Sequence, residues 1–108
     1  MAGAAILVLT QMPDVASAQA LSRALVEARL AACVSIGAPV ESLYHWRGEI
    51  ETATEVPVVI KTRADRYPDV EAAIRARHPY ELPEILAVPV DHGYAPYVDW
   101  LVKEAGGR

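Results

Sequence analysis

The chain has 108 residues, with 10 basic against 14 acidic side chains and a formal net charge of −4. This length predicts a single domain over residues 1–108. An acidic chain without a basic cluster binds phosphate backbones poorly, which argues against nucleic acid and anionic membranes as partners. Hydrophobic residues make up 53% of the chain. That share is high for a small domain and suggests that other subunits bury part of the surface.

The number of cysteines and the N-terminal sequence indicate the cellular compartment. Cys33 is the only cysteine, so one chain can form neither an internal disulfide nor a zinc site with several cysteines. The N-terminus lacks the basic start of a signal peptide, and no apolar run approaches the ~20 residues of a membrane span. We therefore expect a cytoplasmic protein.

The first part of the chain predicts strand, helix, strand. The apolar run 5–9 is typical of a buried strand. Asp14 is a suitable N-cap for a helix over 15–30. A short strand over 33–36 follows and ends at a Gly-Ala-Pro break. The helix assignment depends on apolar residues at helical spacing, namely Ala18, Leu21, Leu25 and Ala28.

A long β-hairpin is predicted next. Residues 40–46 alternate, so Tyr44 and Trp46 share one face, and Arg47-Gly48 is a tight-turn signal before a return strand over 49–62. Pro57 lacks an N–H, so its donor side should face an edge or a bulge. Strands this long exceed the usual five or six residues, so the hairpin must project beyond the rest of the domain. Covering its apolar surface would require another subunit, which predicts a homo-oligomer.

The remaining elements complete the fold class. Asp65 is expected to cap a second helix that ends near His78, because a proline follows. A strand over 84–90 and a helix over 95–104 come last. The order β-α-β-β-α-β-α predicts a ferredoxin-like α+β sandwich plus a C-terminal helix, with an antiparallel sheet and two helices on one face.

One loop concentrates possible metal ligands. His78, Glu81 and Glu84 lie within seven residues, and such a loop could hold Cu(II) or another divalent cation. The alternative is that His78 only ends the helix while prolines stiffen the turn. Cys33, beside a valine, is a weak further candidate and is more simply a small buried hydrophobe.

Two other interpretations remain open from the residues. Glu55 and Lys61 project to the same face of one strand, and with Glu84 they are candidates for an uncharacterised small enzyme. A structural ion pair is the alternative for Glu55 and Lys61. Tyr44 and Trp46 predict an intersubunit anchor, and a small-molecule cleft between subunits could share them.

Several sequence blocks, in register over essentially the whole chain, resemble the CutA divalent-cation tolerance proteins. They are A-R-L-A-A-C-V-S-I at 28–36, S-L-Y-H-W-R-G-E-I at 42–50, H-P-Y-E-L-P-E-I at 78–85 and Y-V-D-W-L at 97–101. The resemblance implies a ferredoxin-like subunit in a homotrimer similar to PII signalling proteins, with hairpins that reach across to neighbouring subunits. It also implies a link to copper tolerance and no established catalysis.

The implied metal site transfers only in part. Some bacterial members have a cysteine at the position of Thr10 and a His-His pair where this chain has Arg77 and His78. Threonine is a poor copper ligand and arginine is none. No cofactor is therefore required, and any divalent cation is expected to bind weakly at His78, Glu81 and Cys33. The alternative is a PII-like sensor whose intersubunit cleft is lined by Tyr44, Trp46, Glu55, Lys61 and Glu84.

Overall fold

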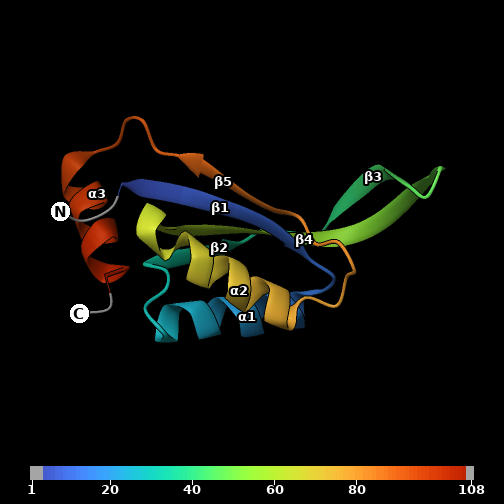
Figure 1. Ribbon diagram of the computed structural model, residues 1–108, viewed down its shortest axis with the longest axis horizontal. Coiled ribbons are helices and arrows are strands. Elements are labelled where there is room, and N and C mark those ends of the chain that lie inside the picture. The colour runs from blue at the N-terminus through green and yellow to red at the C-terminus, as the bar shows by residue number, and fades with distance from the viewer. Residues whose placement is uncertain (1–3, 107–108) are drawn as a thin grey trace.

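A computed structural model describes residues 4–106 (Figure 1). A five-stranded sheet carries two helices on one face, and a third helix lies at one end of the sheet. The elements, in chain order, are β1 (Ala5–Met12), α1 (Val15–Glu27), β2 (Cys33–Ile36), β3 (Val40–Trp46), β4 (Glu49–Arg63), the 3-10 turn η1 (Ala64–Arg66), α2 (Tyr67–Arg77), β5 (Ile85–Pro89) and α3 (Ala95–Glu104).

The sheet has the predicted ferredoxin-like order. Its strands run β2-β4-β1-β5, every neighbouring pair is antiparallel, and β3 pairs only with β4. The fold class expected from the sequence is thus confirmed. Within residues 4–106, no helix is both long and apolar enough to cross a membrane.

The core lies between the sheet and helices α1 and α2. Ile60 occupies its centre, because it stands opposite Val8 of β1 and Val34 of β2 in register. Leu21 and Leu25 of α1 and the buried residues of α2 close over these strands. Alternation along each strand therefore sends one set of side chains into this core and the other set to the opposite face.

That opposite face, here called the open face, is largely uncovered. It carries Leu7 and Leu9 of β1, Val59 of β4, and Leu86 and Val88 of β5, which follow from the strand register. Leu86 and Val88 are 57% and 41% exposed. α3 packs against β4 and β1 at one end only. An apolar sheet face of this kind is unusual on a monomer.

The hairpin projects beyond the helices, as predicted (Figure 1). β4 has 15 residues, and its first half pairs with β3 while its second half lies between β1 and β2. Arg47 and Gly48 both have positive φ, 52° and 83°, between the paired residues Trp46 and Glu49. Positive φ at both central residues defines a type I′ turn, whose twist matches the flanking strands.

The ladder between β2 and β4 ends next to Pro57, so the donor side of this proline faces the end of β2, in agreement with the prediction. Its carbonyl accepts from the Gly37 N–H at 2.9 Å, just past the end of β2. In an antiparallel strand the N–H and C=O of one residue point to the same side. The missing donor of Pro57 therefore falls where β2 has already ended, and the proline costs no hydrogen bond within the β2–β4 ladder.

α1 begins as predicted but ends earlier. The Asp14 carboxylate accepts from the Ser17 N–H at 2.7 Å, and this bond is the main reason that the pKa of Asp14 is lowered. The helix stops at Glu27 and not at Leu30, because Arg29 has φ 57° and the Leu30 N–H bonds to the Leu25 carbonyl. This is a Schellman ending. Ala28, expected in the apolar stripe, is exposed as a result.

The predicted cap of α2 is wrong. Asp65 lies inside η1, and its carboxylate accepts two hydrogen bonds from the Arg63 guanidinium, both at 2.9 Å. That pair lowers the pKa of Asp65, and no side chain caps α2. The helix ends before His78, as predicted, and Pro68 lies in its first turn. Asp65 does not cap the helix because Arg63, two residues earlier in the chain, binds its carboxylate.

Thr10 offers a test of polar burial in the core. Its side chain is buried, and its hydroxyl has no hydrogen-bond partner among residues 4–106. We expect Thr10→Val to raise the free energy of unfolding by about 1 kcal/mol, because it removes a desolvated hydroxyl and keeps the shape. Thr62 is the matched control, since its buried hydroxyl donates to the Leu30 carbonyl at 2.7 Å. Thr62→Val should lower stability by about 1 kcal/mol. Urea unfolding of both variants at one protein concentration measures the effects, and equal signs would contradict the assignment.

Candidate functional site: a groove between the hairpin and the 78–84 loop

One face of the hairpin turns toward the loop that follows α2. Tyr44 stands directly opposite Glu51, and Val40 opposite Glu55, so these residues share a face with Trp46. Residues 80–84 of the loop that follows α2 lie against this face, because they line the same cavities as the hairpin. The groove is thus built by two segments that are distant in the sequence.

Two adjoining cavities make up the groove. The one toward the hairpin tip has a volume of about 450 Å³, and the one toward the sheet has about 570 Å³. Tyr44, Tyr80 and Leu82 line both of them. Trp46, Glu51, Ala53 and Glu81 complete the first, and Ser42, Leu43, Glu55, Pro83 and Glu84 the second. These volumes are in the range of small-molecule sites.

Glu55 is the most deeply placed charge in the groove. It is only 9% exposed, and no ion pair among residues 4–106 includes it. Burial is the main reason that the pKa of the Tyr80 phenol is raised, and the negative charge of Glu55 raises it further. A buried carboxylate without a basic partner is costly, so it is a common mark of a functional position.

His78 has no free ring nitrogen. Its Nδ1 accepts from the Tyr80 N–H at 3.2 Å, and its Nε2 lies 2.6 Å from the Gln11 carbonyl oxygen. The second contact requires that Nε2 donate, so the ring is the neutral tautomer with the proton on Nε2. His78 is also the C-cap residue of α2. The imidazole therefore ties the loop to β1, and it must give up one of these bonds before it can bind a metal.

Glu81 lies at the outer end of the groove. Its carboxylate pairs with the Arg47 guanidinium at 2.9 Å, and both side chains are largely exposed. The same guanidinium lies 5.3 Å from the centroid of the Trp46 ring. A cation is thus already held between an aromatic ring and a carboxylate at the hairpin tip.

Lys61 and Cys33 lie away from the groove. They stand opposite each other on the open face, at the far half of β4. The Lys61 ammonium donates to the Tyr97 hydroxyl at 3.5 Å and lies 5.7 Å from that ring. Lys61 takes part in no ion pair among residues 4–106. Within one chain, then, the groove brings together Tyr44, Trp46, Glu55 and Glu84 but not Lys61.

The expected metal ligands do not converge in one chain. Across residues 4–106, no three His, Cys, Asp or Glu side chains are grouped closely enough to hold a metal ion. Thr10 is buried on the core side of β1, and Arg77 is exposed. Sequence reasoning missed Glu51, Tyr80 and Leu82 as groove residues. Glu51 lies opposite Tyr44 in the hairpin, so strand alternation could have indicated it, whereas nothing in the sequence marks Leu82.

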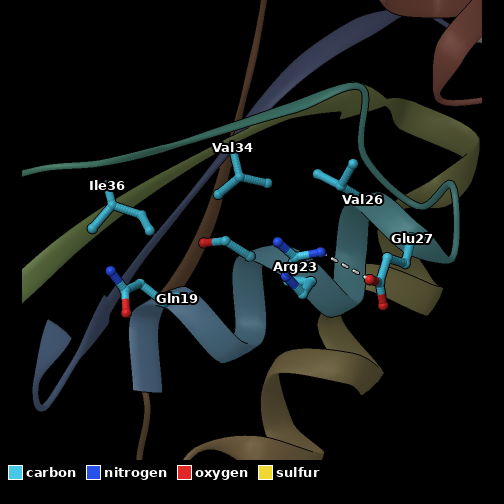
Figure 2. Close-up of a pocket in the computed structure, with 7 residues that line it drawn as sticks. Gln19, Arg23, Val26, Glu27, Val34 and Ile36 are labelled. Atoms are coloured by element: carbon cyan, nitrogen blue, oxygen red, sulfur yellow. Dashed lines mark hydrogen bonds and ion pairs between the residues drawn. The ribbon is translucent and has the colours of Figure 1, made fainter. Parts of the chain in front are cut away.

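A second hollow lies between α1 and β2 (Figure 2). Its volume is about 510 Å³, and Val34 and Ile36 face Gln19 and Val26 across it. An Arg23–Glu27 ion pair of 3.1 Å spans one helical turn at its rim. Both partners are largely exposed, so the pair is worth little energetically. The hollow lacks the buried charge that distinguishes the hairpin groove.

The sheet order, the two covering helices and the projecting hairpin define a ferredoxin-like α+β subunit with an extended arm. Residues 6–104 match the family described as CutA1 divalent ion tolerance protein. The chain therefore belongs to the CutA1 family, as its motifs suggested.

Individual relatives agree with this assignment. The divalent-cation tolerance protein CutA of Thermus thermophilus is 39% identical over 99 residues, which cover 92% of this chain and 96% of the relative. Mouse protein CutA is 42% identical over 89 residues, but these cover 82% of this chain and only 50% of the mouse protein. The crystal structure of CutA1 from a psychrotrophic Shewanella species has a TM-score of 0.91 at 41% identity, covering 96% of this chain and 97% of that one.

Proposed function

We propose that this protein works as a homotrimer in divalent-cation tolerance, in a binding or regulatory role without catalysis. The open face is the observation that carries the assembly, because Leu86 and Val88 leave a contiguous apolar surface exposed in the single chain. The projecting hairpin supports the same proposal, since an arm with exposed apolar side chains needs a neighbour to cover it.

Native mass spectrometry of protein taken directly from cells tests the assembly. One chain has a mass of 11.7 kDa, so a trimer has three times 11.7 kDa, about 35 kDa. A mass near 12 kDa, or that of a dimer, would overturn the proposal. The same spectrum reports any metal or small molecule retained by the assembly.

We propose further that divalent cations such as Cu(II) bind weakly, with His78 and Glu81 as ligands and Cys33 as a weaker candidate. The support is their chemistry, since imidazole and carboxylate suit Cu(II). Weak binding is expected because His78 must release a backbone bond and Glu81 must release Arg47.

Copper titration of the purified trimer tests this metal site. Wild type is expected to bind with a Kd in the micromolar range, and His78→Ala to weaken binding about tenfold. Because His78 anchors a loop, Glu81→Gln serves as a second variant that leaves the fold intact, and it should weaken binding by a smaller factor. Binding unchanged in both variants would overturn the site.

A second candidate function is a small-molecule sensor that uses the hairpin groove. The favouring observation is Glu55, a buried carboxylate without a basic partner that lines a cavity beside Tyr44, Tyr80 and Glu84.

We also propose a cytoplasmic location, supported by the single cysteine. The solved relative from Archaeoglobus fulgidus is described as periplasmic, so cell fractionation is the deciding measurement.

A further inference from the structure

We infer that the hairpin groove binds a small organic ammonium ion, held by Glu55 and by the faces of Tyr44, Trp46 and Tyr80. This inference rests on the second proposed function, a small-molecule site in the groove. It adds the chemical class of the ligand, an alkylated or primary ammonium group on a small organic body.

Charge is the first argument for a cation. Four carboxylates line the two cavities, those of Glu51, Glu55, Glu81 and Glu84, and no lysine or arginine is among the lining residues. Glu55 is nine-tenths buried and has no basic partner within residues 4–106, so an incoming positive group would pair with its carboxylate. An anion would be repelled by Glu51, Glu55 and Glu84, whereas the charge of Glu81 is already paired with Arg47.

The aromatic side chains select an organic cation over a bare metal ion. Tyr44 and Tyr80 line both cavities, and Trp46 lines the outer one. The faces of such rings attract ammonium groups, and they attract weakly hydrated, alkylated ones when water is excluded. A hydrated divalent ion instead needs several oxygen or nitrogen ligands close together, and three such side chains do not converge within residues 4–106.

Arg47 already makes both kinds of contact within the chain, a cation–π contact and an ion pair with a carboxylate. Its guanidinium lies 5.3 Å from the Trp46 ring centroid and 2.9 Å from a Glu81 oxygen. A ligand ammonium placed over Trp46 would compete with this internal cation. Arg47 also has φ 52° at the first central position of a type I′ turn, where asparagine is well accepted. Arg47→Asn therefore removes the competing charge and keeps the turn.

Calorimetric titration of the full-length assembled protein tests the inference, with tetramethylammonium and spermidine as probes. Binding of at least one probe is expected, and Glu55→Gln should weaken it about tenfold or more, because an ion pair becomes a neutral contact. Glu41→Gln is the matched control. It removes the same charge from the opposite face of β3 and should leave the Kd within about twofold. Tetramethylammonium alone would identify alkylated ammonium as the ligand, and spermidine alone would identify primary amines.

Arg47→Asn gives an independent readout with the opposite sign. We expect it to tighten binding of the effective probe about two- to fivefold, by removing the internal cation. Equal losses in Glu55→Gln and Glu41→Gln, or binding of neither probe, would overturn the ligand class. If neither probe binds but native mass spectrometry shows a neutral or anionic molecule lost in Glu55→Gln, the groove remains a ligand site and only the ammonium inference fails.

Discussion

Replacing Val88 by glutamate is expected to reduce the solution mass from about 35 kDa to the 11.7 kDa of one chain. Val88 lies on the open face, opposite Leu7 in the β1–β5 ladder. A carboxylate placed there stays hydrated in the single chain but loses water when another chain covers the face. A buried, unpaired charge costs several kcal/mol, and a trimer would contain three of them.

Val15→Glu is the matched control for this experiment. Val15 is 44% exposed and Val88 41%, so both substitutions make the same chemical change at nearly equal exposure. Val15 begins α1, where a negative charge suits the helix dipole. Light scattering should report an unchanged mass for Val15→Glu. A Val88→Glu protein that kept the wild-type mass would show that assembly uses another surface.

Ile60→Ala is expected to lower the free energy of unfolding by about 2–5 kcal/mol. Ile60 is fully buried where β4 meets both β1 and β2, and it is part of the cluster that α1 and α2 cover. Truncation leaves a cavity that three paired strands cannot easily close. A loss of this size is a large part of the stability of a small domain.

Ile50→Ala provides the comparison on the same strand. Ile50 is 70% exposed on the hairpin, so in the single chain its truncation should change stability by less than about 0.5 kcal/mol. Both variants should be measured by urea unfolding on the Val88→Glu background, because oligomer stability depends on concentration. A loss below about 1 kcal/mol for Ile60→Ala would contradict the assignment of Ile60 to the core.

Much of this fold could be predicted from hydrophobic periodicity. The apolar runs of β1 and β4, the Arg47-Gly48 turn and the proline after α2 are local signals, and each marked an element that the structure contains. The errors occurred where two local signals compete. Asp65 is a good cap by type, but the Arg63 guanidinium binds its carboxylate, and Arg29 adopts the left-handed conformation that ends α1 early.

The groove could be predicted only in part. Strand parity placed Tyr44 and Trp46 on one face, and the register of β4 adds Glu51 and Glu55 to it. Which side of the hairpin the 78–84 loop crosses is a tertiary contact that no spacing encodes, so Leu82 was missed. Lys61 shares the parity of Glu55, yet the strand carries Lys61 well away from the groove. Parity assigns a face, but it does not assign a distance along the strand.

The continuity of β4 makes the core and the groove depend on each other. The strand that contributes Ile60 to the core also contributes Glu55 to the groove, with no loop between them. Because side chains alternate, inserting or deleting one residue between these positions would turn every groove residue of the hairpin to the opposite face. A change of length within β4 would therefore disrupt the groove as well as the core, even though part of that strand lies outside the core.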